Sequence, residues 1–274
     1  MGKEFIVSKA TKQIETLLSD ITEDQMSELT NELMLIRNSD KALLYNRSID
    51  IANTVVDLKE LMMMYSSAMK KARIKLEIFN TEYKLGYQRN PINSIYTRLK
   101  RFASIMEKLE RNGIPFSLDN IENNIYDVAG LRVICSYVDD IYVIADALKN
   151  QSNIELIAEK DYIANPKPNG YRSLHLIIKV PVYFTNQVKN MNVEVQIRTI
   201  AMDFWATLEH QLKYQKQLTN EEEIAAQLKE CAETISATDT RMLSIRKQIE
   251  ENSAEPTKED ILFERMRKID LSIE

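Results

Sequence analysis

The sequence predicts an α+β fold: a mixed sheet of about four or five strands, flanked by helices and extended by further helices at both ends. Two segments, residues 172–180 and 193–198, alternate polar and apolar side chains, as strands with one buried face do. A run of β-branched and apolar residues at 126–135 is typical of a buried strand. Residues 42–83 contain neither proline nor glycine and place apolar residues at helical spacing.

The composition is that of an ordinary globular chain: of 274 residues, 28% are charged and 44% are hydrophobic. The net charge of −5 argues against a dedicated nucleic-acid-binding protein, although it permits a local basic cleft. The two cysteines, Cys135 and Cys231, form neither a metal-binding spacing nor a disulfide framework, which fits a reducing cytoplasm. Because no run of about 18 apolar residues occurs, we expect no membrane segment and a cytoplasmic protein.

The first part of the chain is predicted to be helical. Residues 1–40 are predicted to form two short polar helices, and residues 42–83 one long amphipathic helix or two in series. Gly86 and Pro91 end this stretch. A further helix is predicted at residues 92–111, with apolar residues at helical spacing. Its polar face is rich in basic side chains, which either bind a ligand or are merely solvated; they are Arg98, Lys100, Arg101, Lys108 and Arg111.

The remainder of the chain mixes strands and helices in an order that predicts a mixed sheet covered by helices. Strands are predicted at residues 126–135, 154–163, 172–180 and 193–198. Helices are predicted at residues 139–150, 201–214, 220–251 and 258–269, and a short helix or turn at residues 117–124. We expect three parts: a helical N-terminal extension at 1–53, a central domain at 54–218, and C-terminal helices at 219–274.

Two acidic residues at strand positions, Asp127 and Glu194, are the best candidates for chemistry. Glu194, Gln196 and Arg198 share one face of their strand, where burying them without a purpose would be costly. The sequence contains no P-loop, no G-x-G-x-x-G, no zinc spacing and no H-E-x-x-H. Carboxylates that hold Mg²⁺ among many Arg and Lys residues suit phosphoryl or pyrophosphoryl transfer. On spacing alone, structural ion pairs would explain the same residues equally well.

A series of ordered motifs resembles the synthetase domain of RelA/SpoT homologues, and in particular the stand-alone small alarmone synthetases. The motifs are Arg98-Leu99-Lys100 with Ser104, Ile105 and Lys108, then DVAGLRV at 127–133, KPNGYRSLH at 167–175, EVQIRT at 194–199 and FWATLEH at 204–210. The resemblance covers roughly residues 55–250. Each motif is only moderately specific, but their order and spacing together are hard to obtain by chance.

The resemblance implies an enzyme that transfers the β,γ-diphosphate of ATP to the ribose 3′-hydroxyl of GDP or GTP, which makes ppGpp or pppGpp. It implies that Asp127 and Glu194 hold Mg²⁺ and that Glu194 activates the hydroxyl as a general base. The residues implied in binding ATP are Arg98, Lys100, Lys108, Arg132 and Lys160. Those implied in binding GDP or GTP are Lys167, Tyr171, His175, Gln196 and Asp203, with Tyr171 stacked on the guanine.

The resemblance also implies synthesis without hydrolysis, since no His-Asp hydrolase motif occurs, and assembly into a homotetramer. We expect Trp205 to lie in the core. Asp203 stands where other branches of the family have an asparagine, which weakens its assignment to guanine. Two alternatives stay open: transfer of the diphosphate to the 3′ end of tRNA, and a binding or assembly protein that has lost catalysis. The retention of Asp127 and Glu194 argues against the second.

Overall fold

The computed structural model describes residues 41–87, 89–213 and 221–252. Two compact units divide the chain between Met64 and Tyr65, within the first described helix. The predicted helices at 1–40 and 258–269 lie outside the described residues, as does the predicted boundary at 218/219. Of the first unit, the structure describes only the beginning of that helix. The second unit contains the rest of that helix, the whole sheet and all the other described helices.

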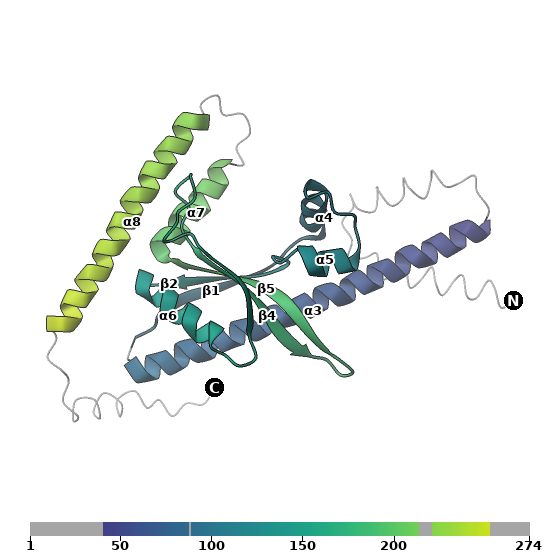
Figure 1. Ribbon diagram of the computed structural model, residues 1–274, viewed down its shortest axis with the longest axis horizontal. Coiled ribbons are helices and arrows are strands. Elements are labelled where there is room, and N and C mark those ends of the chain that lie inside the picture. The colour runs from purple at the N-terminus through teal and green to yellow at the C-terminus, as the bar shows by residue number, and fades with distance from the viewer. Residues whose placement is uncertain (1–40, 88, 214–220, 253–274) are drawn as a thin grey trace. The chain divides into compact units, whose positions relative to one another are not determined.

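The described residues form a five-stranded mixed sheet with six helices, which confirms the predicted α+β class (Figure 1). The strands are β1 (Ile92–Leu99), β2 (Ala129–Cys135), β3 (Glu155–Asp161), β4 (Leu174–Tyr183) and β5 (Val188–Thr199). The helices are α3 (Lys41–Tyr87), α4 (Phe102–Arg111), α5 (Leu118–Asn124), α6 (Val138–Lys149), α7 (Ile200–Lys213) and α8 (Glu221–Asn252). The predicted stretch at 42–83 is therefore one helix, not two.

The strands lie in the order β1-β2-β5-β4-β3. Only the central pair, β2 and β5, is parallel, and the other three pairs are antiparallel. β4 and β5 form a long hairpin, which Figure 1 shows extending beyond the other strands. This topology places β2, which carries Arg132, beside β5, which carries Glu194 and Gln196.

The helix predicted at residues 92–111 is wrong in its first half, because residues 92–99 form strand β1. β1 pairs along the edge of β2, and its Ile92, Ile95 and Thr97 are β-branched residues that favour an extended chain. Tertiary pairing has therefore overridden a spacing that also suits a helix. The second half is helix α4, as predicted, and it buries Ile105 and Leu109. Arg98 thus lies on a strand, and Lys100 lies between the strand and α4.

The sheet buries one face and leaves polar side chains on the other. In β4 the residues alternate between fully buried positions, such as Leu174 and Leu176, and partly exposed ones, such as His175. In β5, Val193, Val195 and Ile197 are likewise buried, as predicted. Apolar residues along one face join buried residues of the helices to form the core. The opposite face is free to carry a site.

The described helices include none that is both long and apolar enough to span a bilayer. Helix α6 contacts β2 and β5, and α8 lies along α7 (Figure 1). Trp205 on α7 is 5% exposed and packs with Ala206 and Ala232, which confirms its prediction as a core residue.

Candidate functional site

Cross-strand pairing aligns the polar side chains of the sheet in rows. One row crosses all five strands and consists of Tyr96, Arg132, Gln196, His175 and Lys160. A neighbouring row runs from Arg98 through Gly130 to Glu194. Directly paired residues point to the same face of a sheet, so these side chains are neighbours although the sequence separates them widely.

A cleft of about 510 Å³ opens above these rows. Six predicted site residues line it: Arg98, Lys100, Asp127, Arg132, Glu194 and Gln196. Gly130 also lines it, between Arg98 and Glu194, and leaves that part of the floor without a side chain. The cleft therefore combines two carboxylates with several cations, although these residues come from three strands and two connecting segments.

Two lysines hold Asp127 at the entrance to β2. Lys100 Nζ lies 2.7 Å from Asp127 Oδ2, and Lys108 Nζ lies 2.8 Å from Oδ1. Burial alone would raise the pKa of Asp127, but the hydrogen bonds and positive charges of the two lysines outweigh it and lower the pKa below its ordinary value. Asp127 is therefore ionised at neutral pH.

Two donors hold Glu194, one on each carboxylate oxygen. His175 Nδ1 lies 3.4 Å from Oε1, and Gln196 Nε2 lies 3.0 Å from Oε2. Burial and the nearby Asp127 raise the pKa of Glu194, whereas His175 and Gln196 lower it, and the net shift is downward. Glu194 is thus a partly buried carboxylate that stays ionised in a cleft, as a general base must be.

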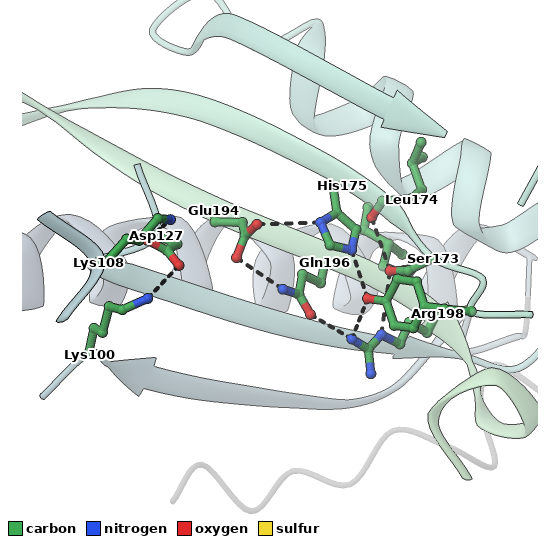
Figure 2. A network of polar contacts seen from close by, with 11 residues as sticks. Lys100, Lys108, Asp127, Ser173, Leu174, His175, Glu194, Gln196 and Arg198 are labelled. Atoms are coloured by element: carbon green, nitrogen blue, oxygen red, sulfur yellow. Dashed lines mark hydrogen bonds and ion pairs between the residues drawn. The ribbon is translucent and has the colours of Figure 1, made fainter. Parts of the chain in front are cut away.

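The contacts around Glu194 close into a ring of five side chains (Figure 2). Tyr171 Oη lies 2.8 Å from His175 Nε2 and accepts a hydrogen bond of 2.6 Å from Arg198 Nη2. The same nitrogen donates to Gln196 Oε1 at 2.7 Å. A network in which every member is bonded holds each side chain in a single orientation.

The loop between β3 and β4 carries Lys167 and Tyr171 and is itself well braced. Lys167 Nζ lies 4.8 Å from the centre of the Tyr171 ring. Asn169 accepts a hydrogen bond from the Tyr171 amide and donates one to Glu209 on α7. Gly170 has a φ of +88° and abuts Ala232 on α8, so this helix supports the loop from outside.

Asp203, in the first turn of α7, is engaged by two arginines. Its Oδ1 lies 3.3 Å from Arg132 Nη1 and 3.2 Å from Arg198 Nη1. Asp203 therefore links Arg132, which is predicted to bind ATP, with Arg198, a member of the ring around Glu194. The sequence alone did not predict this role.

The structure brings most of the predicted site residues together. Lys108 contacts Asp127, and His175 contacts Glu194, so both lie beside residues that line the cleft. Lys160, Lys167 and Tyr171 are not among the described residues that line the cleft; exposed Lys160 stands opposite His175.

Sequence reasoning left Arg198 out of the site. Its position on the face shared with Glu194 and Gln196 was the available signal. Tyr96 was also missed, and its ring lies 5.1 Å from the Arg132 guanidinium.

Asp127 and Glu194 are the residues suited to a metal ion. Within the described residues, no cluster of three or more His, Cys, Asp or Glu side chains could hold one. Mg²⁺, however, commonly takes only one or two carboxylates and completes its shell with water and substrate phosphates. Two ionised carboxylates lining one cleft fit that requirement.

Comparison with known proteins gives consistent matches. Residues 97–219 match the family model described as "Region found in RelA / SpoT proteins". The chain is 41% identical to GTP pyrophosphokinase YwaC of Bacillus subtilis over 201 residues, which cover 73% of this chain and 96% of that protein.

Solved structures agree. The small alarmone synthetase 1 of B. subtilis bound to its product pppGpp superposes with a TM-score of 0.64 at 36% identity, covering 71% of this chain and 98% of that one. The same synthetase bound to AMPCPP gives a TM-score of 0.60 at 34% identity, covering 71% of this chain and 98% of that one.

Proposed function

Because this chain belongs to the RelA/SpoT family, as a small alarmone synthetase, we propose that it is a GTP pyrophosphokinase that transfers the β,γ-diphosphate of ATP to the ribose 3′-hydroxyl of GTP or GDP. One observation carries the proposal: two ionised carboxylates, Asp127 and Glu194, line one cleft together with Arg98, Lys100 and Arg132. Carboxylates beside a group of cations suit a reaction on a polyphosphate.

Glu194 acts as the general base in this proposal. Its carboxylate takes the proton of the 3′-hydroxyl as that oxygen bonds to the β-phosphorus of ATP, and the bond from this phosphorus to the AMP oxygen breaks. A ribose hydroxyl is a weak nucleophile, so an ionised carboxylate within hydrogen-bond reach accelerates the step by about 10²–10⁴-fold. His175 and Gln196, one on each oxygen, orient the carboxylate.

Asp127 and Glu194 would hold Mg²⁺. When bound, the ion neutralises negative charge on the phosphates of ATP. The residues of this chain do the rest of the binding on the donor side. Lys100 and Lys108, already beside Asp127, meet the polyphosphate with Arg98 and Arg132. Lys160, exposed on β3, completes the proposed ATP group.

The guanine nucleotide binds on the His175 side of Glu194, where Lys160 is the one residue of the row assigned to ATP. Tyr171 stacks on the guanine base. The base takes the place over the Tyr171 ring that the Lys167 ammonium occupies in this structure. Lys167 then turns to the phosphates of this nucleotide. His175 lies beside them and keeps its contacts with Tyr171 and Glu194, and Gln196 lines the acceptor pocket. We keep Asp203 in this pocket. Because two arginines already bind its Oδ1, only its remaining acceptor capacity is available to guanine.

We further propose a cytoplasmic homotetramer that synthesises but does not hydrolyse the alarmone. A cytoplasmic location agrees with the unpaired cysteines Cys135 and Cys231. Met242, Ile245 and Ile249 on α8 are 50%, 41% and 62% exposed, and they offer an apolar face for contacts between subunits. A monomer in light scattering at micromolar concentration would contradict the assembly.

A transfer assay tests the activity. Purified protein is incubated with ATP labelled at the γ-phosphate and Mg²⁺, with GTP, GDP or tRNA as the acceptor. We expect labelled pppGpp from GTP and ppGpp from GDP, each with release of AMP. Label on tRNA alone would replace the proposal by the tRNA reaction. In a parallel assay with Mn²⁺ and ppGpp, formation of GDP would contradict synthesis without hydrolysis.

A further inference from the structure

We propose that Arg198 is a positioning residue that fixes the carboxylate of Glu194 through two separate chains of hydrogen bonds. The inference rests on the proposed role of Glu194 as the base. It concerns a side chain that does not itself line the cleft: among the described lining residues, Glu194 and Gln196 are present and Arg198 is not.

Arg198 lies on the same face of β5 as Glu194, four residues farther along the strand. The residue is only 6% exposed, which is unusual for an arginine. Its charge is compensated by Asp203, whose Oδ1 lies 3.2 Å from Nη1, and its Nε donates to Ser173 Oγ at 3.4 Å. The guanidinium is therefore held on two sides, and Nη2 is directed at the ring of hydrogen bonds.

The first chain runs through Gln196. A guanidinium can only donate, so the atom of Gln196 that meets Arg198 Nη2 at 2.7 Å must be the carbonyl oxygen. The amide nitrogen of Gln196 then faces Glu194 Oε2, 3.0 Å away, and donates to it. Arg198 and Glu194 thus fix the two ends of the amide, and without Arg198 only the carboxylate itself would select the nitrogen, so that Gln196 would be held less firmly.

The second chain runs through Tyr171 and His175. Tyr171 Oη accepts from Arg198 at 2.6 Å, so its own proton is free to be donated to His175 Nε2 at 2.8 Å. A neutral imidazole that accepts at Nε2 carries its proton at Nδ1, and Nδ1 lies 3.4 Å from Glu194 Oε1. The donor and acceptor roles follow from the partner of each atom. With these roles, both chains begin at Arg198, and each ends in a group that donates to Glu194.

The two chains together hold the base by both of its oxygens. A general base must meet the reacting hydroxyl at hydrogen-bond distance, and a small displacement reduces the rate strongly. Loss of a residue that orients a reacting group typically costs about 10–100-fold in activity. We therefore expect R198M to lower kcat by about 10–100-fold while KM for ATP changes less than about threefold, because Arg198 makes no contact in the ATP part of the cleft.

Nuclear magnetic resonance of the imidazole nitrogens tests the second chain without any assay of activity. The protein has two histidines, His175 and His210, so the signals that remain in H210Q belong to His175. The spectra of the wild type and of R198M are recorded at the same pH, 8.5. We expect the Nδ1–H tautomer in the wild type and a mixture of tautomers in R198M. A wild type with the proton on Nε2, or an unchanged tautomer in R198M, would overturn the proposal.

Two further variants separate positioning from general damage. R198K keeps a positive charge beside Asp203 but has a single nitrogen in place of the fork. We expect the melting temperature of R198K to lie closer to that of the wild type than the melting temperature of R198M does. We still expect R198K to lose turnover and to show a mixture of His175 tautomers. R246M removes a comparably buried arginine on α8, paired with Asp139, and we expect it to leave kcat and the His175 signals unchanged.

The role of Arg198 and the proposed function can be refuted separately. If R198M and R198K keep wild-type kcat, Arg198 does not position the base and the proposal is overturned. If the wild type transfers no diphosphate to GTP, GDP or tRNA, the proposed function is wrong. The nitrogen spectra then still decide whether Arg198 sets the tautomer of His175.

Discussion

Replacing Gly170 by alanine should loosen the packing of α8 on the loop between β3 and β4. The φ of Gly170 is +88°, a conformation that costs an L-residue roughly 1–2 kcal/mol. A Cβ at this position would lie 2.5 Å from Ala232 Cβ and 3.4 Å from Lys229 Cα, so the helix itself must move. Overpacking of this kind costs about 1–3 kcal/mol, and the two effects together destabilise the fold by about 2–5 kcal/mol.

The assay is a thermal melt followed by circular dichroism. For a chain of this size, 1 kcal/mol shifts the melting temperature by about 2–4 °C, so G170A should melt about 4–20 °C below the wild type. G113A is the matched control, because Gly113 has a φ of +66° but nothing within 4 Å of the added Cβ. It should show the backbone strain alone, a loss of about 1–2 kcal/mol.

A second substitution isolates the steric contact. A232G in the G170A background removes the atom that the new Cβ would strike, and we expect it to recover part of the lost stability, less the cost of about 1 kcal/mol for glycine in a helix. If G170A melts within about 1 °C of the wild type, or no lower than G113A, α8 does not pack on this loop as described.

Two other substitutions address the support of α8 and the donor side of the cleft. In T199V, buried Asp239 loses the hydroxyl that donates to it at 2.6 Å, and the melting temperature should fall by the equivalent of about 1–3 kcal/mol; an unchanged melt would contradict this contact. Burial already raises the pKa of Asp239, so the loss should be larger at pH 7, where its charge is uncompensated, than at pH 4. In K108M, loss of the ammonium 2.8 Å from Asp127 should raise KM for ATP about tenfold in steady-state assays. K189M, outside the cleft, should leave KM unchanged, and a rise in KM for GTP instead would move Lys108 to the acceptor side.

The sequence was informative where one local pattern matched the final environment. The alternation at 172–180 and 193–198 located the hairpin of β4 and β5 and the face that carries Glu194, because a strand with one buried face must alternate. It was misleading at residues 92–99, where the spacing of Ile92, Ile95 and Leu99 suits a helix, and only pairing with β2 decides for a strand.

The arrangement within the site depends on contacts that no local pattern contains. Arg198 was visible as a polar residue on the site face, but its hydrogen bonds to Tyr171 and Gln196 depend on the register of β4 and β5. The support of Gly170 by α8 was equally invisible, because α8 is a charged helix far along the chain and its few buried residues, such as Ala232, do not reveal their partners.

The most direct test of the central claim is the turnover of E194Q with ATP and GTP. Glutamine has nearly the same shape as glutamate but cannot take the proton of the 3′-hydroxyl, so we expect kcat to fall by at least about 10²-fold, with a melting temperature within a few degrees of the wild type. The kcat of D127N should fall by a similar factor. E155Q, which neutralises an exposed glutamate on β3, should keep wild-type turnover. If E194Q and D127N both make pppGpp at the wild-type rate, the catalytic site does not lie in this cleft.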